Sequence, residues 1–422
     1  MNYPSINEAL QELYSLQWMG IKLGLENTEK FLNIIDNPHK KLKVFHVAGS
    51  NGKGSTASYI ASILMEAGFK TALYTSPHFV RFNERIRING EEIPDEYILA
   101  FIAKHMDYAK ENKLTFFEFT TVMAFAYFAE QKVHYAVIET GLGGRLDSTN
   151  VVDSLAAVIT SISLEHTNIL GSTIAQIAKE KAAIIKKCSK VFCGLLPDEA
   201  LQVIEDKCDE NENEFYHTKE YINKRDLEVE LYTEEVTIDR LETPLRGFYQ
   251  KYNSALAILT VIKTLDINDE YLFRKGIKNV ILNTGIQGRF ETLHTHPKIV
   301  IDSAHNAESM QNFVESLLEE RGVVNRKVLF TSLHDKNIPL MLKQLKRVTS
   351  ELIITEIDNP RACSLEELKT FAENEGFKVT ASPNLKELLN QHLQNPDNET
   401  LLIVGSMYLL GEVKAILKEI TE

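Results

Sequence analysis

The stretch from His46 to Thr56, HVAGSNGKGST, combines residue types that together could bind a phosphate group. An apolar run precedes it and apolar residues at helical spacing follow it, so the expected order is strand, glycine-rich turn and helix. Glycines let backbone N–H groups surround an anion, Lys53 adds a positive charge, and Ser55 or Thr56 can hold a phosphate or its magnesium ion. The glycines of GSNG are closer together than in the common P-loop, which argues against a generic kinase or GTPase. A tight glycine turn that caps a helix is the plainer alternative.

Polar residues also stand at the ends of two further predicted strands. Ser76 follows the strand expected at 71–75, and Glu139 closes the strand expected at 134–139. In open α/β sheets the carboxyl ends of parallel strands face the ligand crevice, and oxygen side chains there can hold magnesium. We therefore predict that Ser76 and Glu139 reach a metal ion. A simple Ser-Pro turn and a glycine-rich loop after the strand are the alternatives.

His166 and Lys181 extend this predicted edge. His166 follows the strand expected at 156–161, where a hydrogen-bonded structural histidine fits as well as a metal ligand. Lys181 falls on the apolar face of a predicted helix, where desolvation disfavours the ammonium. A neutral amine near magnesium could add carbon dioxide and form a carbamate that binds the metal. Periodicity by itself favours a simpler interpretation, a lysine whose amine reaches solvent along its apolar stem.

A second group of charged residues lies near residue 290. Arg289 follows Gly288 and could clamp a phosphate when a hinge closes, Asp302 ends an apolar strand, and His305 begins the next helix. The N-terminus of a helix favours anions, so this group could also face a phosphate. Taken one by one, a hinge arginine and a helix cap explain these residues equally well.

These residues must be positioned by elements that alternate along the chain. Short apolar runs alternate with segments of helical period, which predicts βαβ units and a mostly parallel sheet with helices on both faces. Residues 227–231 and 236–238 alternate with period two and predict a hairpin. The expected strands are 42–48, 71–75, 134–139, 156–161 and 191–195, and the expected helices are 55–67, 95–110, 118–131, 172–187 and 250–264.

Glycines, histidines and a proline at 285–297 predict a linker, after which the alternation resumes. We expect strands at 298–302, 327–332, 351–355, 378–380 and 401–405, with helices at 306–320, 338–347, 364–374 and 384–392. The fold class is therefore α/β. An N-terminal domain at 1–295 would hold a P-loop ATPase-type, mostly parallel sheet with a small β-hairpin extension, and a smaller Rossmann-like α/β domain would span 296–422.

Composition and charge narrow the possible partners. The chain has 422 residues and a net charge of −13, which argues against nucleic acid but permits a local basic pocket. Its four cysteines form no C-x-x-C pair and suggest reduced thiols, so we expect a cytoplasmic protein. We also expect a monomer. Neither a signal peptide nor an apolar run of membrane-spanning length stands out, and no membrane partner is expected.

Together these motifs resemble the folylpolyglutamate synthase/dihydrofolate synthase family, a branch of the Mur ligase superfamily. The matching segments appear in family order from residue 44 to about 413: HVAGSNGKGST, TSPHFVRFNERI, FFEFTT, VIETGLGGRLDSTN, LEHTNILGSTIAQIAKEKAAIIK, LRGFYQKYNSA, GRFETL, DSAHN and LLIVGSMYLLGEV. The resemblance implies ATP-dependent amide formation. ATP would phosphorylate a substrate carboxylate to an acyl phosphate, and the amine of L-glutamate would then displace the phosphate.

The resemblance also implies roles for individual residues. ATP contacts match Asn51, Gly52, Lys53, Gly54, Ser55, Thr56, Asn253, Arg289 and Asp302, and the metal positions match Ser76, Glu139, His166 and Lys181. Two Mg²⁺ sites are implied, one through a carbamylated Lys181, together with a monovalent cation. The catalytic positions match Lys53, Lys181, Arg289 and His305, and the pterin-binding positions match Gly20, Ile21, Lys22, Leu23, Thr121, Leu146, Asp147 and Ser148.

The implied function is addition of L-glutamate to the γ-carboxylate of folate or its polyglutamates. The shared motifs leave two alternatives open: dihydropteroate as the acceptor, as in a dihydrofolate synthase, or both activities in one enzyme. A switch protein that hydrolyses a nucleotide is an alternative of another class. Such a protein would have no use for a second α/β domain that carries Arg289, Asp302 and His305.

Overall fold

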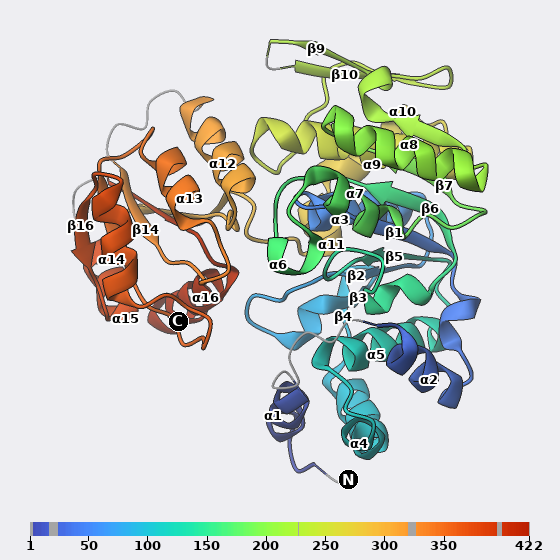
Figure 1. The fold of residues 1–422 in the computed structure, drawn as a ribbon, viewed down its shortest axis with the longest axis horizontal. Coiled ribbons are helices and arrows are strands. Elements are labelled where there is room, and N and C mark those ends of the chain that lie inside the picture. Colours follow the sequence, from blue (N-terminus) through green and yellow to red (C-terminus); the bar gives the residue numbers. More distant parts are fainter. Residues whose placement is uncertain (1–2, 17–23, 227, 320–325, 395–398, 422) are drawn as a thin grey trace. The chain divides into compact units, whose positions relative to one another are not determined.

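The computed structural model describes residues 3–16, 24–226, 228–319, 326–394 and 399–421. Contacts along the chain divide it into two compact units, whose elements are labelled in Figure 1. The larger unit comprises Met1–Pro77, Phe82–Pro244 and Lys251–Gly285. The smaller unit comprises Ile286–Glu422 and two short segments from earlier in the sequence, His78–Arg81 and Leu245–Gln250.

The larger unit is built on one sheet of eight strands. The strands are β1 (Val44–Ala48), β2 (Thr71–Tyr74), β3 (Ile86–Ile88), β4 (Glu91–Glu92), β5 (Tyr135–Glu139), β6 (Ser154–Ile159), β7 (Lys190–Cys193) and β8 (Phe215–His217). Their order is β4-β3-β2-β5-β1-β6-β7-β8. The six strands β2, β5, β1, β6, β7 and β8 run parallel, and β3 and β4 form an antiparallel edge beside β2. All residues of β1 are buried, as a central parallel strand requires.

Helices cover both faces of this sheet (Figure 1). Val44 and Ala48 of β1 point to the same face of the sheet, where Val44 packs in a core with α5 and Ala48 packs with α7 and α8. Helix α3 contacts β1, β2 and β5 and packs against α10. The helices are α1 (Ile6–Ser15), α2 (Glu26–Ile34), α3 (Lys53–Glu66), α4 (Asp95–Glu111), α5 (Phe116–Glu130), α6 (Thr167–Leu170), α7 (Ile174–Ala182), α8 (Asp198–Asn211), α9 (Phe248–Leu265), α10 (Glu270–Lys278) and α11 (Val280–Thr284), with 3₁₀ turns η2 (Pro38–Lys41), η3 (Phe82–Arg85), η4 (Ser148–Val151) and η5 (Thr218–Tyr221).

The predicted hairpin forms part of a separate three-stranded antiparallel sheet. Strand β10 (Glu228–Tyr232) pairs with β11 (Thr237–Ile238), as its period-two pattern predicts. A further strand, β9 (Ile222–Arg225), pairs with the other edge of β10. The sheet lies near α9 and α10 in Figure 1, away from the main sheet of the unit.

The smaller unit is a six-stranded sheet with helices on both faces. Its strands are β12 (Glu291–Thr295), β13 (Lys298–Ile301), β14 (Arg326–Phe330), β15 (Glu351–Ile354), β16 (Lys378–Ala381) and β17 (Thr400–Val404), in the order β12-β13-β17-β14-β15-β16. All neighbours run parallel except β12, which is antiparallel to β13. Its helices are α12 (Ala307–Glu319), α13 (Ile338–Leu345), α14 (Leu365–Asn374), α15 (Leu385–Gln394) and α16 (Met407–Thr421).

Alternate residues of the strands divide the smaller unit into two cores. Val300 and Leu402 point into a core formed with α12, α13 and α14. Ile301 and Ile403, one residue further along each strand, point into a core formed with α15 and α16. This alternation is the period-two rule for a sheet buried on both faces.

The structure differs from the sequence-based expectations at several elements. Residues 291–295, expected in a linker, form β12, so the expected domain boundary after residue 295 falls inside the β12–β13 hairpin. The helix expected to reach residue 187 ends at Ala182, because the next amides bond to carbonyls only three residues back.

Within the described residues, none of the helices combines the length and the apolar character that crossing a membrane requires.

Helix α5 supplies a test of how local capping supports this core. Thr115 Oγ1 accepts a hydrogen bond from the Glu118 amide at 3.2 Å, and Glu118 Oε2 accepts one from the Thr115 amide at 2.6 Å. Both residues are buried, so Thr115→Ala should lower the free energy of unfolding by about 1–2 kcal/mol in urea titrations. Thr115→Ser keeps the hydroxyl and is the control. Equal stability of the alanine variant and the wild type would contradict this role.

Candidate active site

The loop between β1 and α3 requires glycine at two positions. A Cβ on Gly49 would overlap Thr160 Oγ1, and a Cβ on Gly52 would lie 2.8 Å from Asn253 Oδ1. Gly52 also has φ +83°, a left-handed value, where it begins α3. The structure therefore brings Asn253 of α9 against the loop, next to the other residues predicted to contact ATP.

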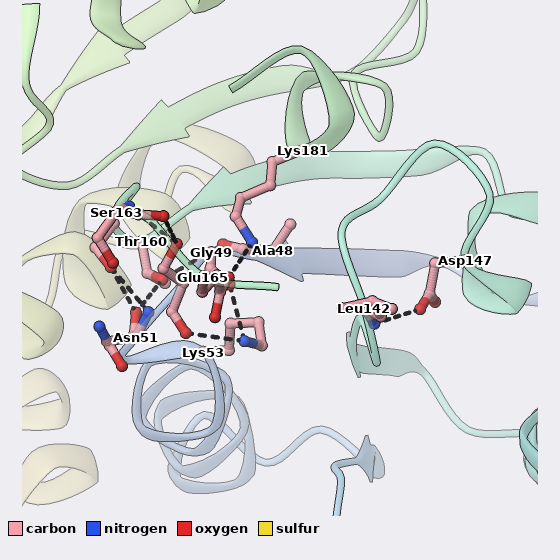
Figure 2. A network of polar contacts seen from close by, with 12 residues as sticks. Ala48, Gly49, Asn51, Lys53, Leu142, Asp147, Thr160, Ser163, Glu165 and Lys181 are labelled. Atoms are coloured by element: carbon pink, nitrogen blue, oxygen red, sulfur yellow. Dashed lines mark hydrogen bonds and ion pairs between the residues drawn. The ribbon is translucent and has the colours of Figure 1, made fainter. Parts of the chain in front are cut away.

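The loop is fixed by the segment that follows β6. The amides of Ser50 and Asn51 donate to Ser161, to its carbonyl at 2.8 Å and to its hydroxyl at 2.9 Å. Thr160 Oγ1 donates to the Asn51 carbonyl at 2.6 Å, and the Ser163 amide donates to Ser50 Oγ at 3.0 Å. Figure 2 shows this group of contacts beside the start of α3. The shape of the loop is therefore set before a ligand arrives.

Lys53 lies over the loop that it belongs to. Its Nζ donates to the carbonyls of Gly49 at 2.8 Å and Ser50 at 3.2 Å (Figure 2). Within the described chain, the buried hydroxyl of Thr56, in the first turn of α3, has no hydrogen-bond partner. A cation, a helix N-terminus and an unpartnered buried hydroxyl together suit a bound phosphate.

Ser76 and Glu139 meet at the carboxyl ends of β2 and β5. The Ser76 amide donates to Glu139 Oε2 at 3.0 Å, and Glu139 is buried. The pair places a carboxylate and a hydroxyl side chain at one point of the sheet edge. Such hard oxygen donors are the ligands that Mg²⁺ prefers, so these residues fit the predicted metal.

Lys181 forms a buried ion pair with Glu165. Its Nζ lies 2.7 Å from Glu165 Oε1, with side-chain exposures of 1% and 8% (Figure 2). Burial alone would raise the pKa of Glu165, but the charges of Lys181 and Lys53 lower it to about 2. Burial lowers the pKa of Lys181, and the charge of Glu165 opposes that effect. Its burial matches the apolar helix face on which the sequence places it, whereas its partner was not predicted.

His166 lies beside this ion pair. It precedes α6 with φ +44°, and its charge is among the causes that lower the pKa of Glu165. The left-handed backbone is uncommon for a residue other than glycine, and such conformations often occur at functional sites. The structure therefore places two of the predicted metal ligands, His166 and Lys181, next to Glu165.

A second buried network links β1 to the loop after β5. Asp147 accepts hydrogen bonds from the amides of Leu142 at 2.8 Å and Thr149 at 3.0 Å, and from the Thr149 hydroxyl. Because that hydroxyl donates to Asp147, its oxygen must accept from His46 Nε2 at 2.9 Å. Burial, and then the charge of Lys186, lower the pKa of His46 to about 3, so this histidine is neutral. The sequence predicted Asp147 as a substrate contact but missed His46 and Thr149.

The other predicted pterin contacts are divided between several elements. Thr121 of α5 is buried and lies 3.2 Å from the Tyr74 hydroxyl, while Ser148 begins η4 and is buried beside the half-buried Leu146. The segment predicted to contact the pterin first, Gly20, Ile21, Lys22 and Leu23, lies outside the described residues.

In the smaller unit, Arg289, Asp302 and His305 cluster at the end of β13. Asp302 accepts the amides of Phe290 and Ala304, each at 2.8 Å, and Arg289 bonds to the Ser303 hydroxyl. Burial raises the pKa of Asp302 to about 6, although the charge of Arg289 opposes this shift. His305 Nδ1 must donate to the Ser303 carbonyl at 2.7 Å, which fixes its tautomer when it is neutral. The cluster is therefore preorganised by its own backbone.

Comparison with known proteins agrees with this arrangement. Residues 47–261 match the Mur ligase middle domain, and residues 288–407 match the Mur ligase glutamate ligase domain. A dihydrofolate synthase/folylpolyglutamate synthase of Bacillus subtilis is 34% identical over 415 residues, which cover 94% of this chain and 96% of the relative. The chain belongs to the dihydrofolate synthase/folylpolyglutamate synthase family of Mur ligases. The resemblance expected from the motifs is thereby confirmed.

Solved structures of this family share the fold along nearly the whole chain. Escherichia coli FolC in complex with DHPP and ADP has a TM-score of 0.88 at 27% identity, covering 99% of both chains. The bifunctional folylpolyglutamate synthase/dihydrofolate synthase of Yersinia pestis, complexed with AMPPNP and a Mn ion, has a TM-score of 0.86 at 28% identity, covering 98% of both chains. The predicted α/β fold class is confirmed by these likenesses.

The neutral, buried His46 makes this family member sensitive to acid. Its pKa is about 3 in the folded chain and about 6.5 when unfolded, so its stabilising contribution is present above pH 6.5 and is lost as the pH falls towards 3. His46→Gln keeps a donor for Thr149 and removes the titration. Between pH 7 and 5, urea titrations should show a loss about 2 kcal/mol smaller in the variant than in the wild type. Parallel pH profiles would refute the assignment.

Proposed function

We propose that this chain is an ATP-dependent ligase that adds L-glutamate to the γ-carboxylate of folate or its polyglutamates and releases ADP and phosphate. The observation that carries the proposal is the glycine-restricted loop of Lys53 in a unit that also holds the buried pair Lys181–Glu165 and the Ser76–Glu139 contact. The match to a glutamate ligase domain over residues 288–407 supports glutamate as the incoming amino acid.

The reaction brings two anions together, and the loop supplies the charge that this requires. A substrate carboxylate oxygen attacks the γ-phosphorus of ATP, which gives an acyl phosphate and ADP. The glutamate amine then attacks the acyl carbon, a tetrahedral intermediate forms, and phosphate leaves with the electrons of the broken C–O bond. The Lys53 ammonium and the amides from Gly52 to Ser55 would stabilise the transferred phosphate, because fixed positive charge and N–H dipoles act where negative charge accumulates.

The metal is assigned to the edge of the sheet. Ser76, Glu139, His166 and a carbamylated Lys181 would hold two Mg²⁺ ions, with a monovalent cation nearby. Bound Mg²⁺ neutralises phosphate charge and polarises the phosphoryl group. A carbamate on Lys181 would replace its ammonium by an anion, so Glu165 would have to exchange that partner for another cation. The proximity of Lys53, whose charge also lowers the pKa of Glu165, supports that exchange.

The remaining residues are assigned by their place in the family motifs. Asn253, Arg289 and Asp302 would contact ATP, and His305 would lie near the acyl phosphate and the incoming glutamate. Thr121, Leu146, Asp147 and Ser148 would contact the pterin, as would Gly20, Ile21, Lys22 and Leu23. The network from His46 through Thr149 supports this use of Asp147, because it holds the carboxylate in one orientation.

Dihydrofolate synthase activity is the second candidate. The names of the Bacillus subtilis relative and of the Yersinia pestis protein combine both activities, and a Lacticaseibacillus casei folylpolyglutamate synthase is 32% identical over 92% of both chains. Dihydropteroate carries a carboxylate that the same acyl-phosphate chemistry could activate. The two candidates therefore differ in the acceptor and not in the reaction.

The acceptor dependence of ATP turnover tests both candidates. Purified protein should release ADP and phosphate only when L-glutamate and a pterin carboxylate are present together. Tetrahydrofolate and dihydropteroate, supplied in parallel, separate the two activities, and mass spectrometry of the product should show one added glutamate per phosphate. Phosphate release at the same rate without L-glutamate and without a pterin carboxylate would overturn the ligase assignment.

Lys181 offers a sharper test of the metal assignment. Lys181→Ala should reduce turnover on the order of a hundredfold or more, because a metal ligand is lost. Short-chain carboxylic acids should restore part of the activity by taking the place of the carbamate. Lys179→Ala, an exposed change on the same helix, is the matched control. Because Lys181→Ala leaves Glu165 buried without that partner, its thermal unfolding and ATP binding should be measured as well; full activity would refute the role.

A further inference from the structure

A second cluster of metal-binding side chains lies in the smaller unit, apart from the residues discussed above. His334, Cys363 and Glu367 each offer one ligand atom, and these three atoms all lie within 4.8 Å of one another. His334 follows β14, Cys363 precedes α14, and Glu367 lies in the first turn of α14. An imidazole, a thiol and a carboxylate form a donor set that is typical of zinc.

The backbone fixes the two segments that carry these side chains. An isolated bridge pairs Leu333 with Ala362. On either side of it, the His334 amide donates to the Arg361 carbonyl at 2.9 Å, and the Cys363 amide donates to the Ser332 carbonyl at 3.0 Å. The histidine and the cysteine are therefore held on adjacent antiparallel segments rather than on independent loops.

Hydrogen bonds also orient the ligand atoms themselves. His334 Nδ1 lies 3.1 Å from the Arg361 carbonyl, which can only accept, so this nitrogen carries a proton. The other nitrogen, Nε2, lies 3.3 Å from Glu367 Oε1. Glu367 Oε2 is already engaged, because it accepts the Ser364 amide at 2.9 Å and the Ser364 hydroxyl at 2.8 Å in a capping box. A carbonyl behind the imidazole and a capped carboxylate are typical supports of metal ligands.

The local charge favours a cation. Glu367 supplies a carboxylate oxygen within 4.8 Å of the Cys363 sulfur. A divalent metal would offset this negative charge as it displaces the thiol proton.

We propose that His334 Nε2, Cys363 Sγ and Glu367 Oε1 bind one zinc ion, with water as the fourth ligand. Tetrahedral zinc holds its ligand atoms roughly 3.5 Å apart, so the widest separation, which is no more than 4.8 Å, has to shrink by at most about 1.3 Å. His334 and Glu367 are exposed and can make this movement by rotation about their side-chain bonds, while the buried Cys363 stays in place. The ion would tie the segment after β14 to the start of α14. This site is independent of the proposed ligase reaction.

Cobalt(II) provides a direct probe, because a cobalt–thiolate bond produces an intense near-ultraviolet charge-transfer band. The metal site assigned to the ligase reaction contains no sulfur, so cobalt bound there does not produce this band. The full-length protein, stripped with a chelator, should develop the band on titration with one equivalent of cobalt and lose it on addition of zinc. Absence of the band in the wild type would overturn the proposal.

Three variants identify the ligands. Cys363→Ser should abolish the band, His334→Ala should weaken cobalt binding at least about tenfold, and Cys188→Ser, a change at an exposed cysteine, should leave both unchanged. Because Cys363 is buried, thermal unfolding without metal checks that its variant folds, and the exposed His334 variant gives the result if it does not. Wild-type cobalt binding in both the Cys363 and His334 variants would refute the site.

Discussion

The parallel register of three central strands is the constraint on which the site of the larger unit depends. Strand β1 lies between β5 and β6, with Val47 opposite Glu139 and Ala48 opposite Ile159. Three features therefore lie at the same end of the sheet: the loop between β1 and α3, the predicted metal ligand Glu139, and the segment after β6 that holds the loop. A shift of one residue in the β1–β5 pairing would turn Glu139 to the other face of the sheet relative to β1, because successive side chains of a strand alternate.

Burial of charge is the second condition that this site satisfies. An ammonium and a carboxylate removed from water are tolerated together, since each offsets the desolvation of the other, whereas one alone would be strongly destabilising. Glu165 and Lys181 form such a pair, and they stand at the two ends of a short stretch of chain that contains α6. The same stretch also carries His166, so a predicted metal ligand and the buried ion pair lie in one segment.

Local sequence patterns predicted many of the elements that carry the site, whereas contacts between residues far apart in the chain could not be predicted. The order of strand, loop and helix around Lys53 followed from the apolar run before the glycines and the helical spacing after them. Helical period placed Lys181 on the apolar face of its helix, but it favoured an amine that reaches solvent, whereas the structure buries that amine against Glu165. The partnership of Glu165 could not be predicted, because it depends on how the chain turns at α6. Strands β3 and β4 are too short to show alternation, and β12 was taken for a linker because glycines and a proline flank it. Thr149 and His46 meet only through the sheet, 103 residues apart in the chain.

The position of Lys53 has a consequence for which anions the loop can select. Its ammonium donates hydrogen bonds to two carbonyls of its own loop. An anion that binds Lys53 therefore has to replace these neutral acceptors. A charged acceptor forms hydrogen bonds roughly twice as strong as a carbonyl does, which makes the exchange favourable for a densely charged polyphosphate. For a weakly charged or neutral molecule, this exchange of hydrogen-bond acceptors gains little free energy. In the proposed ATP-binding role, the loop would therefore discriminate between anions by their charge density.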